Sequence, residues 1–164
     1  APILSFTADE LWKHLPDYHG RAEKVFLAPM PKIEEKYIDE DLGARWERMR
    51  EVREVVTKAL EKARAEKFIG NPLESKLILE VNTELKQFLE SFEQDLPDLF
   101  IVSQVEFGVA QGDYVYETEN MPGLKVGVVK SEGEKCSRCW KFAKTIGENS
   151  QHPEICARCA AVVE

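Results

Sequence analysis

Residues 136–159 read CSRCWKFAKTIGENSQHPEICARC and contain the four cysteines of the chain, Cys136, Cys139, Cys156 and Cys159. They form two C-x-x-C pairs with 16 residues between them, a spacing within the range of structural zinc sites. Two residues between cysteines let one tight turn direct both sulfur atoms at one ion, and two such turns complete a tetrahedron. The pattern therefore predicts one structural Zn²⁺ ion held by four thiolates.

Other interpretations of the cysteines fit less well. Disulfides suit a secreted chain, but no export signal is visible, and a redox C-x-x-C accounts for one pair and not two. His152 could replace a ligand, but a complete four-Cys set makes it redundant, so we expect it in an exposed loop. Four sulfurs leave no position open for water or substrate, so we expect the metal to fold residues 132–164 without taking part in chemistry.

The first cysteine pair carries side chains suited to nucleic acid: Arg138, Trp140 and Lys141. An aromatic ring beside cations can stack on an unpaired base while the cations hold phosphates. Alternatively, Trp140 packs under the metal-binding turn and the arginines are merely solvated. Both interpretations stay open for Trp140, and solvation is favoured for Arg158.

A long helix is predicted upstream, because apolar residues recur every three or four positions and Gly70-Asn71-Pro72 then ends the pattern. The apolar positions are Leu42, Trp46, Met49, Val52, Val56, Leu60 and Ala63. We expect other helices to cover this stripe. Residues 1–41 supply one short helix for the purpose, opened by a capping box of Thr7 and Glu10. Residues 1–72 are therefore predicted to be a partial helical bundle.

The middle of the chain mixes strand and helix patterns. Strands are predicted near 77–81, 105–109 and 124–129, a helix near 85–92, and a possible hairpin partner of 105–109 at 114–117. Residues 99–102 are ambiguous, since Pro97 suits a helix start. The predicted fold class is α followed by α+β: a partial bundle (1–72), a small mixed α/β junction domain (73–131) and a four-Cys zinc-ribbon-like finger (132–164).

The formal charge of −8 makes the whole chain a poor polyanion binder. However, residues 43–68 carry 8 basic and 5 acidic side chains, and residues 135–164 carry 5 and 3. Nucleic-acid contacts are expected on these two basic segments, with Arg53, Lys58 and Arg64 as candidates on the long helix, although solvated charges fit them equally well. No catalytic motif is recognisable, and no apolar run is long enough to span a bilayer.

Several segments, in order, resemble one family. PILSFTADELW (2–12) resembles the helical anticodon-binding domain of class I aminoacyl-tRNA synthetases for aliphatic amino acids. VREVVTKALEKAR (52–64) and IGNPLE (69–74) resemble the isoleucine-specific synthetases in particular. KCSRCW (135–140) with CARC (156–159) resembles the C-terminal zinc finger of the bacterial members, a motif shared with certain DNA glycosylases.

The resemblance implies the C-terminal portion of a cytoplasmic ligase that attaches isoleucine to its tRNA using ATP. The HIGH and KMSKS signatures of the ATP site do not occur here, so this chain alone is not expected to be catalytic. The implied partners are the isoleucine tRNA, contacted on its anticodon side, and the rest of the synthetase, with neither DNA nor membrane.

Two other function classes stay open. The first is a zinc-stabilised protein–protein module, in which the acidic region 69–134 and an exposed helix stripe dock a partner. The second is a glycosylase-type DNA-binding finger, which predicts an N-terminal Pro-Glu where this sequence has Ala1-Pro2.

Overall fold

The computed structural model describes residues 1–92, 94–112 and 114–163. The chain forms two compact units, Ala1–Glu40 and Asp41–Glu164. The first contains helix α1 (Ser5–His14) and two 3₁₀ turns, η1 (Val25–Leu27) and η2 (Glu35–Tyr37). Within the described part of the chain, no helix combines the length and the apolar character needed to cross a membrane.

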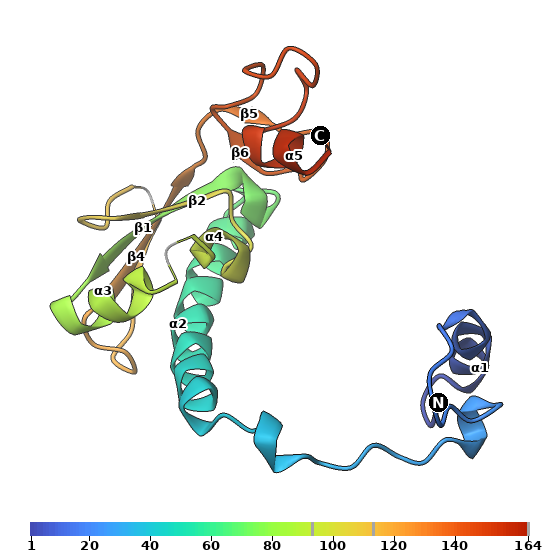
Figure 1. Cartoon of the computed structure of the whole chain (residues 1–164). Coiled ribbons are helices and arrows are strands. Elements are labelled where there is room, and N and C mark those ends of the chain that lie inside the picture. Colours follow the sequence, from blue (N-terminus) through green and yellow to red (C-terminus); the bar gives the residue numbers. More distant parts are fainter. Residues whose placement is uncertain (93, 113, 164) are drawn as a thin grey trace. The chain divides into compact units, whose positions relative to one another are not determined.

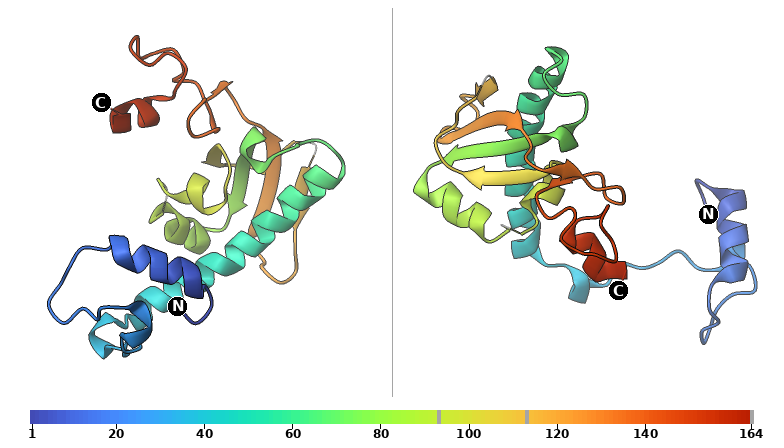
Figure 2. Two further views of the ribbon diagram at one scale, coloured as in Figure 1. Left: turned by 90° about the vertical axis from the view of Figure 1, so that its right-hand side faces the viewer. Right: turned by 90° about the horizontal axis from the view of Figure 1, so that it is seen from above.

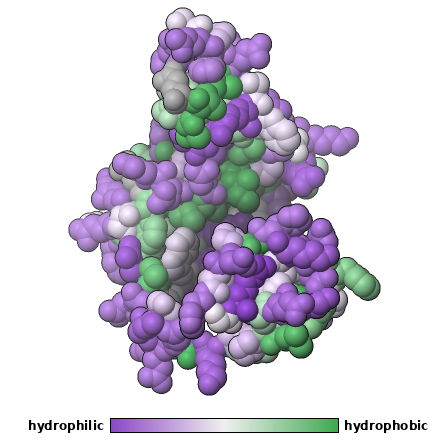
Figure 3. Space-filling model, turned by 45° about the vertical axis from the view of Figure 1, so that its right-hand side comes forward, coloured by the Kyte–Doolittle hydropathy of each residue, from purple (hydrophilic) through white to green (hydrophobic). Residues whose placement is uncertain are grey.

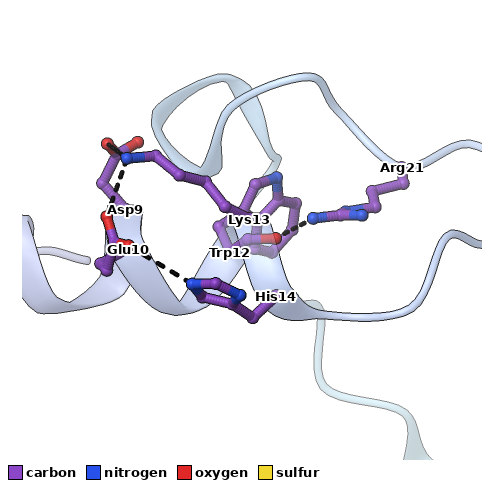
Figure 4. A network of polar contacts seen from close by, with 6 residues as sticks. All are labelled: Asp9, Glu10, Trp12, Lys13, His14 and Arg21. Carbon is purple, nitrogen blue, oxygen red and sulfur yellow. Dashed lines mark hydrogen bonds and ion pairs between the residues drawn. The ribbon is translucent and has the colours of Figure 1, made fainter.

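Helix α1 lies at the surface of its unit, and none of its residues is buried. The predicted capping box is wrong, because the N-cap is Leu4 and no side chain caps the first turn. The helix begins early enough to place Thr7 inside it. Glu10 instead accepts hydrogen bonds along the helix from Lys13 (2.8 Å) and pairs with His14 (3.3 Å; Figure 4).

Arg21 closes the other end of α1. Its guanidinium donates hydrogen bonds to the carbonyl oxygens of Trp12 and Leu15, pairs with Asp17 at 2.6 Å and lies 5.2 Å from the centre of the Trp12 ring (Figure 4). The Trp12 indole N–H donates in turn to the carbonyl of Ala22 (2.9 Å). These contacts satisfy carbonyl groups that a helix C-terminus leaves without partners.

The second unit places a sheet beside helices (Figures 1 and 2). Its elements are α2 (Glu40–Ala65), η3 (Pro72–Glu74), β1 (Ser75–Val81), α3 (Thr83–Glu90), α4 (Leu96–Leu99), β2 (Gln104–Phe107), β3 (Tyr114–Glu117), β4 (Leu124–Lys130), β5 (Glu134–Lys135), β6 (Phe142–Ala143) and α5 (Ala157–Val163). The four-stranded sheet has the order β2-β1-β4-β3, with β1 parallel to β2 and antiparallel to β4.

The core lies between α2 and one face of the sheet. Leu77 pairs with Val128 and Leu79 with Val126, so the four side chains share a face, and each is fully buried. The apolar stripe of α2 belongs to the same cluster from Met49 onward. The expectation that other helices cover this stripe holds only in part: Leu85, Leu89 and Leu96 of α3 and α4 belong to the cluster, and the sheet contributes to it as well.

One strand prediction needs correction and one ambiguity is resolved. The segment Tyr114–Glu117 pairs antiparallel with β4, and not as a hairpin with the strand at 104–107, which pairs parallel with β1. Pro97 lies in the first turn of helix α4, as its fixed φ favours. The division into three domains stays a prediction, and the structure adds that α2 packs on the sheet of the middle segment.

Candidate metal centre and nucleic-acid interface

The four cysteine sulfurs converge on one point of the last segment, the finger (132–163). Their Sγ atoms all lie within 4.8 Å of one another, and those of Cys139 and Cys156 are 3.8 Å apart. A tetrahedron of sulfurs about 2.3 Å from a zinc ion has edges of about 3.8 Å. The four thiols are unpaired by disulfides, so the donor set fits Zn²⁺.

Local turns aim these sulfurs. The Cys136 N–H donates to the Lys141 carbonyl (2.9 Å) and the Trp140 N–H donates back to the Cys136 carbonyl (3.0 Å), which closes the first turn. Trp140 adopts a left-handed backbone conformation there, with φ of 65°. The second pair brackets the start of α5, so that Cys156 precedes the helix and Cys159 lies inside it.

The N–H groups of these turns favour negative charge on one sulfur. Those of Cys139 and Cys156 point at the Cys136 sulfur from 3.5 and 3.4 Å. Burial raises the pKa of the Cys136 thiol, but the N–H groups outweigh burial and lower this pKa to about 6. Burial raises the pKa of Cys139, and raises that of Cys156 to about 12. A zinc ion would supply the positive charge that keeps all four ionised.

A metal here would be structural. Cys136, Cys139, Cys156 and Cys159 would hold it, and four thiolates leave no position for a substrate. The buried cluster around them consists of the cysteines with Ala143, Ile146 and Ile155, which is too little apolar surface to fold a segment alone. His152 is half-buried in a turn, and it is outside the cluster of possible ligands found among the described residues.

Asp98 of α4 joins the finger to the body of the second unit. Its carboxylate accepts from Lys141 Nζ (2.7 Å) and from Arg158 Nη1 (3.0 Å). The hydrogen bond from Lys141 lowers the pKa of Asp98 against the opposing effect of burial, and Arg158 lowers it further. One carboxylate thus holds a cation from each half of the finger.

Two further polar joints lie near the start of β2. Ser103 Oγ accepts from the Phe142 N–H (2.7 Å) and donates to the Leu73 carbonyl (2.5 Å). The Glu132 carboxylate binds Lys76 (2.8 Å) and Lys144, and these two cations lower its pKa to about 2. The finger is therefore fastened to the sheet as well as to α4.

The structure places the predicted nucleic-acid residues in different settings. Arg138 and Trp140 are exposed, and 61% of Trp140 is accessible, with Lys135 Nζ 5.7 Å from its ring centre. Trp140 is outside the buried cluster of the finger. Lys141, in contrast, has 15% of its side chain exposed and is engaged by Asp98.

The candidates on α2 divide into two groups. Arg53 and Arg64 line one pocket, and Arg53 Nε also donates to the Leu99 carbonyl (2.9 Å). Lys58 lines another pocket, formed with Thr118 and neighbouring residues. The structure therefore brings the two arginines together and leaves Lys58 apart from them.

Sequence reasoning missed Asp98, Ser103 and Glu132. Their partners lie far along the chain: Arg158 is 60 residues from Asp98, Phe142 is 39 residues from Ser103, and Lys76 is 56 residues from Glu132. Each of the three is an ordinary polar residue in an acidic or strand-flanking stretch, and no local pattern distinguishes it.

Known proteins match the chain in two regions. The model of the anticodon-binding domain of tRNA ligases matches residues 1–81, and that of the zinc finger found in FPG and IleRS matches residues 133–162. The second region contains all four cysteines.

Relatives match over the full chain. It is 38% identical over 166 residues to the isoleucine–tRNA ligase of Moorella thermoacetica, 43% over 166 to that of Geobacter sulfurreducens and 41% over 165 to that of Kosmotoga olearia. These alignments cover 99%, 100% and 99% of this chain, but 18%, 18% and 17% of the relatives. The chain thus spans less than a fifth of their length.

Proposed function

Because this chain belongs to the isoleucine–tRNA ligase family, we propose that it is a tRNA-binding region of such an enzyme. The observation that carries the proposal is the finger: a four-cysteine centre that presents the exposed Trp140 and Arg138 and is fastened to the body through Asp98. An exposed ring beside cations suits an unpaired base with its phosphates.

The specific partner is the isoleucine tRNA, contacted on its anticodon side. Zinc, one ion in each chain, holds the finger in shape and does no chemistry. Activation of isoleucine with ATP belongs to other parts of the enzyme, so this chain alone is not catalytic, and its place of action is the cytoplasm. We expect no DNA partner. Residues 1–81, which lie outside the finger, match a domain that binds tRNA anticodons.

The test is titration of the full chain with the isoleucine tRNA and with an unrelated tRNA, at two salt concentrations. Because the net charge is −8, binding should be weak, and because it depends on cations that contact phosphates, it should decline as salt is raised. Removal of zinc by a chelator should abolish it. Binding that is unaffected by the chelator, or equal for both tRNAs, contradicts the role of the finger.

A second contact is favoured by the unit 1–40. Its apolar side chains are widely open to solvent, among them Ile3 (92% exposed), Phe6 (94%) and Ile33 (87%), and Figure 3 shows hydrophobic atoms at the molecular surface. A partner that covers such side chains is a protein. The rest of the synthetase is the partner we propose, because the relatives are more than five times as long as this chain.

A further inference from the structure

A pocket of about 220 Å³ lies between α2 and the turn after α4. Its apolar walls include Leu60, Phe100 and Ile101, and its polar rim includes Arg53, Glu61 and Arg64. Pockets for drug-sized ligands enclose roughly 300–1,000 Å³. The occupant is therefore a smaller group, with apolar faces and a polar edge.

The rim suits the edge of a nucleobase. Arg53 and Arg64 donate hydrogen bonds, and Glu61 accepts them, so the rim can pair with ring acceptors and with an exocyclic amine. The sum of these charges is positive, which favours a group attached to a phosphate. Arginine planes are also among the surfaces on which single-stranded RNA bases stack.

Ile101 is held in an unusual conformation beside this rim. Its φ is 58°, a left-handed value that β-branched residues rarely adopt, and 52% of it is exposed. Hydrogen bonds from the Ile101 and Val102 N–H groups to the Asp98 and Pro97 carbonyls fix the turn. This is the left-handed turn that often ends a helix, here with isoleucine where glycine is usual, and it presents an apolar side chain to solvent.

The pocket wall also directly follows, in sequence, the residue that holds the finger. Asp98 holds Lys141 and Arg158 of the finger, while Leu99 accepts from Arg53 and Phe100 and Ile101 form the pocket wall. Four consecutive residues therefore connect the two sites.

We propose that the pocket between α2 and the turn after α4 binds one unpaired RNA nucleobase, with Arg53, Arg64 and Glu61 at its edge and Ile101 against its face. The proposal rests on the proposed function, because it assigns a position to one nucleotide of the bound tRNA. The nucleotide is one whose base is extruded from the loop.

The test uses the full zinc-loaded chain and a fluorescently labelled RNA hairpin of the tRNA anticodon arm, with binding followed by anisotropy. Arg64→Gln and Ile101→Gly should each weaken binding by about tenfold, the range of a lost base contact. Lys62→Gln is the matched control, because it removes a charge from the same exposed turn of α2 outside the pocket. It should weaken binding by about twofold or less.

A second arm removes the base instead of the side chain. One abasic nucleotide is placed in turn at each position of the hairpin loop. At one position it should weaken the affinity of the unaltered chain by about tenfold, but should cause no additional loss of affinity in Arg64→Gln. Ile101→Gly should unfold at the same temperature as the unaltered chain or higher, since glycine adopts this φ without strain. Its weaker binding would then not reflect misfolding.

The experiment distinguishes failure of the pocket proposal from failure of the proposed function. If the unaltered chain binds the hairpin but the pocket variants behave like Lys62→Gln, or the abasic penalty persists in them, the pocket proposal is overturned alone. If the unaltered chain binds no RNA at all, the proposed function is overturned, and the pocket proposal with it.

Discussion

Asn in place of Asp98 should loosen the finger without releasing its metal. The Asp98 carboxylate accepts from Lys141 at 2.7 Å and from Arg158 at 3.0 Å, and these two cations belong to opposite halves of the finger. The uncharged amide keeps one acceptor and loses both ion pairs. No cysteine ligand is altered, so the metal content should stay at one zinc in each chain.

The magnitude follows from exposure. Arg158 and Asp98 have 58% and 54% of their side chains exposed, and such a surface pair is worth about 0.5 kcal/mol. Lys141 has 15% of its side chain exposed, and its charge-assisted hydrogen bond is worth about 1–1.5 kcal/mol after allowance for the exposure of its partner. The docked arrangement should therefore lose about 1.5–2 kcal/mol, which makes its opening roughly 10- to 30-fold more frequent.

Amide hydrogen exchange measures that opening. The Phe142 N–H, bound to Ser103 Oγ at 2.7 Å, reports on the joint and should exchange roughly 10- to 30-fold faster in Asp98→Asn. Asp95→Asn is the control, because Asp95 makes no side-chain cap at the same helix. Equal protection of this amide in both variants would refute the reasoning, and so would loss of zinc from Asp98→Asn.

Four other changes test separate parts of the structure. Cys139→Ser should unfold the finger while α2 and the sheet persist, because the metal supplies the folding free energy of the finger; circular dichroism and near-ultraviolet tryptophan signals check this. Trp140→Ala should weaken tRNA binding by about 1–3 kcal/mol and Trp140→Phe by less; unchanged affinity per folded molecule would instead favour a packing role. Glu132 has a folded pKa of about 2, below its ordinary 4.5, so its contribution is complete above pH 4.5 and declines as pH falls toward 2; the difference in melting temperature between the parent and Glu132→Gln should shrink in that interval. Leu77→Ala should cost about 2–5 kcal/mol in urea unfolding, since Leu77 is fully buried in the main core.

Periodic patterns predicted the elements well. The stripe of α2 and the alternation along β1 each reflect a repeat within one element, so residues a few positions apart contain the whole signal. The cysteine spacing predicted a four-sulfur cluster for a similar reason, because each pair shares one turn and the chemistry of zinc requires the other two ligands.

The partners of those elements were harder to predict. An apolar stripe shows that a helix face is buried but not which elements bury it, so the pattern along α2 predicts helical partners and does not reveal that the sheet shares this role with α3 and α4. The Tyr114–Glu117 strand was paired with its nearest neighbour in sequence, whereas β4 supplies a longer edge. Asp98 and Ser103 act over 60 and 39 residues, distances at which one sequence carries no signal.

The main core and the sulfur cluster are separate groups of buried side chains. The contacts described between them are ion pairs and hydrogen bonds, which transmit little cooperativity compared with shared apolar packing. Calorimetry should accordingly resolve two unfolding transitions in Asp41–Glu164. The total calorimetric enthalpy should then exceed the van't Hoff enthalpy of either transition. A single melting point would then describe neither part, and a chelator would shift one transition and leave the other in place.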